Sequence, residues 1–218
     1  MRRNFDAQLD ILNDSLIEMG KMVVGAISNA IKALMEQDVE LANRIINSDD
    51  DIDHREKDIE SQCLRLIMKQ QPVARDLRHV SSIMQITTDL ERIADHASDI
   101  SELILLIAGK QFIKKLVNIP KMADETMKMV EGSIEAFVNR DLELAKSIIA
   151  HDDIVDNLFN VVKSTLIEMI KENADNGDQA IDLIMIAKYF ERIGDHATNI
   201  AEWVIFSISG WHKDIKVM

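Results

Sequence analysis

The chain has 218 residues, of which only 7 are glycine and 2 are proline. An all-β sandwich or barrel needs turn-forming residues at intervals of about 8–12 positions, so this composition excludes one. With 47% hydrophobic and 29% charged residues the chain can bury a core, and its net charge of −13 argues against sequence-independent binding of nucleic acid.

The first half of the chain predicts three helices. Apolar residues recur every three or four positions over residues 5–34, as expected for one face of a long helix. Asp38 has the side chain of a helix N-cap and opens a second helix that runs to about Gln70. We expect a third helix to begin at Pro72, since proline is favoured in the first turn, and to close at Gly109.

The second half predicts the same scheme. A fourth helix starts near Pro120 and ends around residues 139–140, and Asp141 caps a fifth helix that runs to about Glu172. Residues 173–178 form a turn, after which the apolar spacing predicts a sixth helix. The expected fold is therefore all-α, with six long antiparallel helices in two tandem three-helix bundles.

An internal repeat relates the two halves. Residues 91–102 match residues 191–202 at an offset of 100, with 8 of 12 identical. A second match, at an offset of 103, relates residues 38–53 to residues 141–156 and includes their acidic positions. Because helix packing alone would repeat only apolar positions, we infer a duplication. The predicted units are residues 1–110 and 111–218.

Two features of the sequence indicate where in the cell the protein is located. A single cysteine, Cys63, excludes an intrachain disulfide and indicates a reducing environment. The basic N-terminal residues have no apolar segment behind them, and the longest apolar run spans residues 103–108, far short of the roughly 20 residues of a membrane span. We expect a cytoplasmic protein without a transmembrane segment. Four unrepeated histidines are expected at the surface: His54, His79, His151 and His212.

Repeated carboxylates are the candidate functional residues. Glu91 and Asp95 are four positions apart, hence neighbours on one helix face, and the same holds for Glu191 and Asp195. Like charges at this spacing destabilise a helix by roughly 0.2–0.5 kcal/mol unless something compensates them. A bound cation would compensate them.

The preceding helix of each repeat adds further acids. If the second and third helices fold back on each other, Asp50 and Asp53 lie at the level of Glu91, and the same argument brings Asp153 and Asp156 near Asp195. Oxygen ligands suit hard cations such as Mg²⁺, Mn²⁺, Ca²⁺ or iron. The candidate metal ligands are Glu91, Asp95, Glu191, Asp195, Asp50, Asp53, Asp153 and Asp156.

A simpler interpretation stays open, in which these acids form a solvated helix face. Arg92 and Arg192 are placed to pair with Asp95 and Asp195, three positions away. The repeated histidines at positions 96 and 196 stand about 140° around the helix from the glutamates, so we do not expect them as ligands. No histidine follows a glutamate by three positions, which is the pattern of di-iron bundles.

The chain resembles the PhoU family of phosphate-signalling proteins. The resemblance rests on the twin segments Glu-Arg-Ile-(Ala/Gly)-Asp-His-Ala at residues 91–97 and 191–197, and on Gln-Pro-Val-Ala-Arg-Asp-Leu-Arg at residues 71–78. It covers essentially the whole chain, including its duplication and helix order. One departure is Ala94, where the second copy has Gly194.

The resemblance implies an all-α, often dimeric regulator rather than an enzyme. Such a protein would be a cytoplasmic adaptor between the ATPase subunit of a phosphate ABC transporter and a membrane sensor histidine kinase, and it would hold the phosphate-starvation response off when phosphate is plentiful. Family members carry metal clusters at Glu/Asp-x-x-x-Asp motifs, which correspond here to Glu91/Asp95 and Glu191/Asp195. The ion is expected among Mg, Mn, Fe or Zn.

Two other functions remain open from the sequence. One is a metal-dependent enzyme, such as a carboxylate-bridged oxidase or a phosphohydrolase. The other is a plain helical interaction module that binds no metal. The chain lacks a Gly-rich phosphate loop, a Gly-x-Ser-x-Gly elbow and a His-Glu-x-x-His motif, which weighs against the enzyme.

Overall fold

Long α-helices make up nearly all of the structure, a computed structural model that describes residues 2–109, 118–213 and 215–216. Two-residue strands, which were not predicted, follow the last helix and pair antiparallel. The elements are α1 (Arg2–Glu36), α2 (Val39–Gln70), α3 (Arg75–Ile107), α4 (Ile119–Asn139), α5 (Leu142–Glu172), the 3₁₀ helix η1 (Ala174–Asn176), α6 (Gly177–Ser209), β1 (Trp211–His212) and β2 (Ile215–Lys216).

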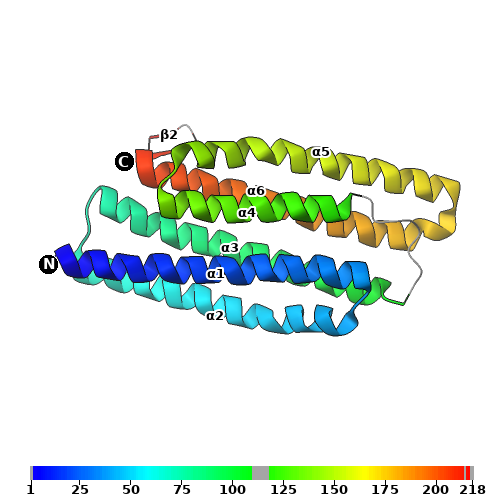
Figure 1. The fold of residues 1–218 in the computed structure, drawn as a ribbon, viewed down its shortest axis with the longest axis horizontal. Helices are drawn as coiled ribbons and strands as arrows, with labels where there is room; N and C mark the ends of the chain where they lie inside the picture. The colour runs from blue at the N-terminus through cyan, green and yellow to red at the C-terminus, as the bar shows by residue number, and fades with distance from the viewer. Residues whose placement is uncertain (1, 110–117, 214, 217–218) are drawn as a thin grey trace.

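The long helices form two three-helix bundles that lie side by side. Helices α1, α2 and α3 pack against one another, as do α4, α5 and α6, and the bundles meet where α3 packs on α6 and α1 on α4. Successive helices run in opposite directions along the long axis (Figure 1). The predicted fold class is confirmed. The predicted boundary at residues 110/111 lies outside the described residues, so the two unit ranges stay a prediction.

The connection between the first two helices of each bundle is built in the same way. Gln37 and Arg140 both take a left-handed φ of 53°, and the next residue, Asp38 or Asp141, is an extended N-cap. The Asp38 carboxylate accepts a hydrogen bond from the Leu41 amide at 2.9 Å. Asp141 accepts one from the Leu144 amide at the same distance. Both predicted caps are confirmed, and the repeat extends to the turn itself.

The third helix begins later than predicted. Gln71 and Ala74 take left-handed φ angles of 47° and 48°, so Pro72 lies in the connection and α3 starts at Arg75. The chain has to reverse direction between two antiparallel helices, and this reversal uses the residues around the proline. Pro120, in contrast, lies in the first turn of α4, as expected.

A single apolar core runs through both bundles and draws on every long helix. Phe137 and Phe190 are among its largest fully buried side chains. The prediction that His79 lies at the surface is wrong. His79 is buried between helices, and its ring stacks on the Phe137 ring with 4.8 Å between ring centroids. Burial, with the nearby Arg140, lowers the pKa of His79 to about 4, which keeps the ring neutral.

The C-terminal strands fold back on the end of α6. The His212 ring stacks on Trp203 with 4.1 Å between centroids, and Lys213 Nζ lies 3.1 Å from Glu202 Oε2. Trp211 in β1 is half exposed. Among the described residues, no helix combines the length and the apolar character of a membrane span.

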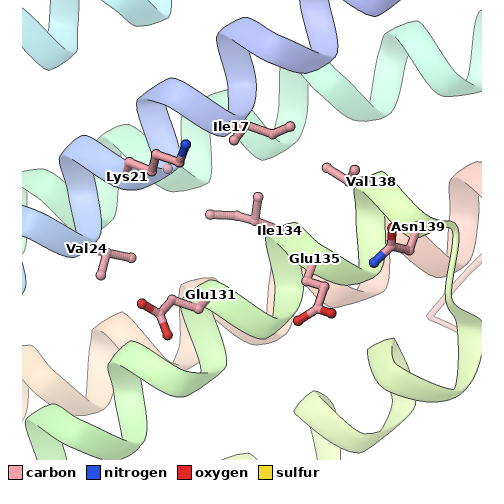
Figure 2. Close-up of a pocket in the computed structure, with 9 residues that line it drawn as sticks. Ile17, Lys21, Val24, Glu131, Ile134, Glu135, Val138 and Asn139 are labelled. Atoms are coloured by element: carbon pink, nitrogen blue, oxygen red, sulfur yellow. The ribbon is translucent and has the colours of Figure 1, made fainter.

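An apolar groove of about 430 Å³ lies on the seam between α1 and α4. Figure 2 shows Ile134 and Val138 pointing from α4 toward α1. Gly20 leaves room there, because a Cβ atom at this position would stand 2.3 Å from Ile134 Cδ1. Ile17, Val24, Ile134 and Val138 form the apolar part of its lining, and Lys21, Glu131, Glu135 and Asn139 line it as well.

Candidate metal centre

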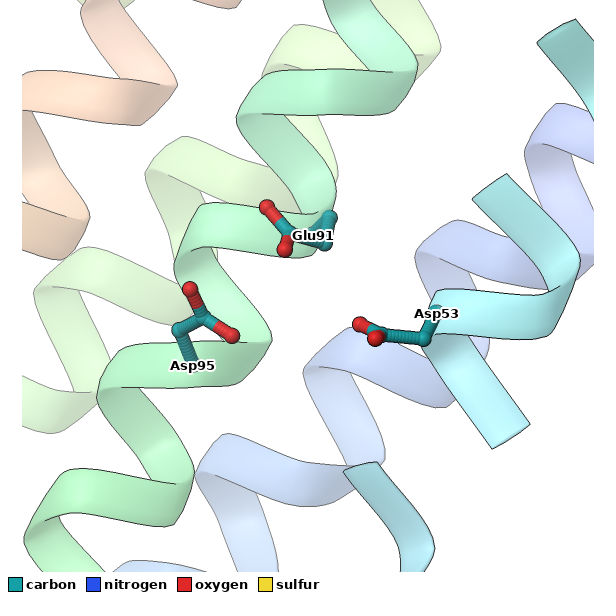
Figure 3. Close-up of side chains that lie close together, drawn as sticks. All are labelled: Asp53, Glu91 and Asp95. Carbon is teal, nitrogen blue, oxygen red and sulfur yellow. The ribbon is translucent and has the colours of Figure 1, made fainter. Parts of the chain in front are cut away.

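Three carboxylates converge between α2 and α3. Asp53 points from α2 toward α3, where Glu91 and Asp95 lie on successive turns (Figure 3). One oxygen atom from each of the three lies within 4.8 Å of the others. The i,i+4 spacing of Glu91 and Asp95 puts both on the face of α3 that packs on α2. We refer to Asp53, Glu91 and Asp95 as the first cluster.

Repulsion and burial make the metal-free cluster unfavourable. Burial, followed by the charge on Asp95, raises the pKa of Glu91 to about 7 from its ordinary 4.5, and Glu56 and Asp53 add to the shift. Burial also raises the pKa of Asp49 to about 6, and Asp95 and Asp53 contribute. Asp49 lies one turn before Asp53 on α2. The charges on two acids of the first cluster therefore act on a fourth acid, one turn away on α2.

Two exposed basic side chains, Arg92 and Lys57, form ion pairs with the acids of the first cluster. Arg92 approaches Asp95 Oδ2 at 2.9 Å and Glu91 Oε2 at 3.4 Å, but its side chain is 55% exposed. Lys57 Nζ lies 3.6 Å from Asp53 Oδ2 and is also exposed. Glu91 Oε2 is buried and accepts no hydrogen bond. A buried carboxylate oxygen that accepts no hydrogen bond and is paired with the exposed Arg92, beside two more carboxylates, fits a hard divalent cation.

The structure brings some of the predicted ligands together and not others. Asp53, Glu91 and Asp95 form the cluster, whereas Asp50 and Asp153 are exposed on α2 and α5. Sequence reasoning missed Asp49 and its repeat counterpart Asp152. Both recur at the offset of 103, and each precedes another acid by four positions, as Glu91 precedes Asp95. That shared spacing is the signal that identifies them.

The second repeat gathers the equivalent acids less tightly. Burial raises the pKa of Asp152 to about 6, and the charges on Asp156, Asp195, Glu191 and the adjacent Asp153 add to the shift. Asp152, Asp156, Glu191 and Asp195 are the repeat counterparts of Asp49, Asp53, Glu91 and Asp95. We refer to them as the second cluster. A Cβ atom on Gly194 would stand 3.0 Å from Asp152 Oδ1, so the glycine lets this carboxylate approach α6 closely.

Two differences separate the second cluster from the first. Within the described residues, only the first cluster holds three acids at metal-ligand spacing. The paired cations also differ, because Lys188 forms an ion pair with Glu191, whereas Arg92 and Lys57 form ion pairs with the first cluster.

The repeated histidines lie at the interface between α3 and α6. The rings of His96 and His196 are 5.6 Å apart between centroids. Nδ1 of His196 lies 2.8 Å from Asp89 Oδ1, and Nδ1 of His96 lies 3.3 Å from Asp99 Oδ2. Each histidine is thus engaged with a carboxylate outside the two clusters.

The raised carboxyl pKa values predict a stability that falls as pH rises. In metal-free protein, folded Glu91 keeps its proton up to about pH 7, whereas the unfolded chain loses it near 4.5. The folded state therefore binds more protons between these values, and its free energy of unfolding decreases through this window. We expect a loss of about 1–2 kcal/mol, after allowance for solvent around the partly exposed acids. Urea unfolding at pH 5.0 and 7.5 measures it.

A charge-neutral variant provides the control for this pH dependence. Glu91→Gln is expected to flatten the slope, because the amide does not titrate. Saturating Mg²⁺ or Mn²⁺ is expected to reverse the slope, since a cation binds the deprotonated acids. An unchanged slope in Glu91→Gln would show that the pH dependence arises elsewhere.

Comparison with known proteins agrees with the sequence resemblance. The PhoU domain family model matches residues 16–104 and again residues 119–204. The chain is 36% identical over 215 residues to a protein of Clostridium acetobutylicum named phosphate-specific transport system accessory protein PhoU homolog, and the match covers 98% of each chain. It is 40% identical over 185 residues to a protein of the same name from Aquifex aeolicus, covering 85% of this chain and 84% of the relative.

Solved structures show the same fold. The crystal structure of PhoU from Pseudomonas aeruginosa superposes with a TM-score of 0.91 at 32% identity and covers 95% of this chain and all of that one. The phosphate transport system regulatory protein PhoU from Streptococcus pneumoniae superposes with a TM-score of 0.89 at 29% identity, covering 97% of this chain. Two domain matches, full-length relatives and a shared fold agree: the chain belongs to the PhoU family.

Proposed function

We propose that this protein is a metal-binding cytoplasmic regulator of phosphate uptake and of the phosphate-starvation response. It acts as an adaptor between the ATPase subunit of a phosphate ABC transporter and a membrane sensor histidine kinase, and it keeps the response off when phosphate is plentiful. Membership of a family whose relatives are named accessory proteins of phosphate-specific transport supports this proposal. We also propose that the protein works as a homodimer.

The observation that carries the metal-binding part is the first cluster. Asp53, Glu91 and Asp95 present oxygens within 4.8 Å of one another, and one buried oxygen of Glu91 accepts no hydrogen bond. A divalent cation held there would add positive charge to that of Arg92 and Lys57 and would link α2 to α3. All-oxygen donors favour Mg²⁺, Mn²⁺ or iron over Zn²⁺, which usually takes nitrogen or sulfur ligands as well.

Phosphate status reaches the protein through its partners in this proposal. The net charge of −13 disfavours direct capture of a phosphate anion, and the sequence has no Gly-rich nest that precedes a helix. We favour a regulatory over a catalytic role because the relatives are named accessory proteins.

Affinity purification from membranes of phosphate-replete cells tests the adaptor role. We expect tagged wild-type protein to recover a transporter ATPase and a sensor kinase. In this proposal the bound metal orders the partner-binding state. We therefore expect less ATPase and less kinase to be recovered by a combined variant with the substitutions Glu91→Ala, Asp95→Ala, Glu191→Ala and Asp195→Ala.

The matched control replaces the exposed acids Asp50 and Asp153 with alanine, which is expected to leave recovery unchanged. If wild-type protein recovers neither partner, the adaptor proposal is wrong. Size-exclusion chromatography with light scattering reports the dimer separately.

A further inference from the structure

The two repeats carry opposite charge around the connection between their last two helices. Residues 61–80, which we refer to as the basic connection, contain four basic residues and one acid, whereas their repeat counterparts, residues 164–180, contain one basic residue and four acids. Each basic residue has an acidic counterpart at the offset of 103 on α2 and of 100 from Arg75 onward: Arg65 and Glu168, Lys69 and Glu172, Arg75 and Asp175, Arg78 and Asp178. The duplicated positions therefore differ in the sign of their charge.

These two connections lie at opposite ends of the molecule. The α2–α3 connection lies at the end where the N-terminus is marked, and the α5–α6 connection lies at the other end (Figure 1). Over residues 2–10, which begin α1 at the first of these ends, two arginines and two aspartates cancel. The protein has a net charge of −13, yet the basic connection makes one end attractive to an anionic surface.

A pocket of about 230 Å³ between α1 and α2 contains two cations of the basic connection. Arg65 and Lys69 line it from α2, and the remaining lining residues carry no charge: Gln8, Ile11, Leu12, Gln62 and Leu66. Within the part of the chain that the structure describes, neither Arg65 nor Lys69 forms an ion pair. The pocket therefore offers guanidinium, ammonium and amide donors, which suit phosphate oxygens.

Apolar side chains are exposed beside these cations. Val73 is 75% exposed and Met68 is 69% exposed, the two highest values among the described large hydrophobic residues. Val73 lies in the connection itself, between the helix ends, and Met68 has the charged residue Lys171 as its repeat counterpart. Exposed apolar side chains flanked by lysine and arginine are the combination that binds the interface of an anionic membrane.

We propose that the basic connection docks on an anionic lipid surface. Phosphate groups of the lipid heads bind at Arg65 and Lys69, and Val73 and Met68 insert among the head groups. A membrane presents many phosphates at once, so the contacts of several basic side chains add, whereas a free phosphate ion meets only one pocket. Val73 lies in a connection at the end of the bundle, from which it can reach a flat surface. The inference goes beyond the adaptor role and requires neither a bound metal nor a protein partner.

Flotation of the full-length protein with lipid vesicles tests the inference. Vesicles of phosphatidylglycerol mixed with an equal share of phosphatidylcholine are compared with vesicles of phosphatidylcholine alone. EDTA is present throughout, so that divalent cations do not bridge carboxylates to lipid. We expect binding to the anionic vesicles only, and less of it as NaCl is raised, because salt screens the attraction. Sodium phosphate at the same ionic strength is expected to displace the protein no more than NaCl does.

Substitutions locate the surface. Arg65→Gln combined with Lys69→Gln is expected to weaken vesicle binding on the order of thirtyfold, because each basic side chain near an anionic surface contributes roughly fivefold in affinity. Val73→Ser is expected to weaken it roughly tenfold through the loss of an inserted apolar side chain. The matched control combines Lys163→Gln with Lys171→Gln, which removes the same charge from exposed positions of α5 and is expected to leave binding unchanged. Circular dichroism checks that the helices of each variant are intact.

Four outcomes would overturn the inference. Wild-type protein could fail to float with anionic vesicles at low salt, or the Arg65→Gln, Lys69→Gln variant could float as well as the wild type. Stronger displacement by phosphate than by chloride would assign the pocket to free phosphate. Loss of partner proteins from affinity purifications of the same variant, without vesicle binding by the wild type, would assign the surface to an acidic protein. Since the vesicle assay contains neither metal nor partner, its failure leaves the proposed metal binding and adaptor role standing.

Discussion

Replacing Asp53, Glu91 and Asp95 together with alanine is expected to abolish high-affinity binding of Mn²⁺ at the first cluster. Wild-type protein gains about 2.7 kcal/mol of stability at a cation concentration one hundred times its dissociation constant, and the variant should lose this gain. Metal content after dialysis, measured by mass spectrometry, and melting with and without MnCl₂ provide two independent readings.

The metal-free state of this variant is informative in itself. Removal of three converging acids relieves the burial of charge and the repulsion that raise the pKa of Glu91, so the metal-free variant should melt at or above the temperature of metal-free wild-type protein. Asp50→Ala is the matched control, because Asp50 is an exposed acid on α2, the helix that carries Asp53. A variant that keeps its Mn²⁺-dependent stabilisation would remove the first cluster as the metal site.

Phe190→Ala is expected to lower the free energy of unfolding by about 3–5 kcal/mol. Phe190 is fully buried on α6 as part of the apolar core, so truncation leaves a cavity in that core. The repeat counterpart Leu90 is equally buried. Denaturant unfolding of the metal-free protein measures the change.

An exposed residue of the same helix is the control for this core substitution. Ile181 is 58% exposed, and its replacement by alanine is expected to alter stability by no more than about 0.5 kcal/mol. A small effect of Phe190→Ala would contradict the prediction and would mean that the core collapses around the cavity.

Local signals were enough to predict the helices and most of their ends. Asp38 and Asp141 cap helices as their chemistry requires, and Pro120 lies in the first turn of α4. The prediction that the third helix starts at Pro72 was wrong because proline occurs both in the first turn of helices and in loops. The surface prediction for His79 was wrong because the sequence pattern does not show which helices pack over this residue.

The candidate site was predictable in its helices but not in its full membership. Asp49, Asp50 and Asp51 are consecutive, so the face of α2 that turns toward α3 decides which of them contributes, and that face is set by packing. The ion pair of Lys188 with Glu191 was predictable, because the two residues are three positions apart on α6, the spacing that pairs Arg92 with Asp95 on α3.

The C-terminal turn beyond α6 determines what optical probes can detect. The two tryptophans of the chain are Trp203, near the end of α6, and Trp211, in β1, and Trp203 is stacked on His212 of that turn. Intrinsic fluorescence therefore monitors one end of the second bundle, far along the sequence from the first cluster, whereas circular dichroism averages over all the helices. Unfolding curves that coincide by the two methods would show that the bundles melt as one cooperative unit, and separate curves would show that each bundle melts on its own.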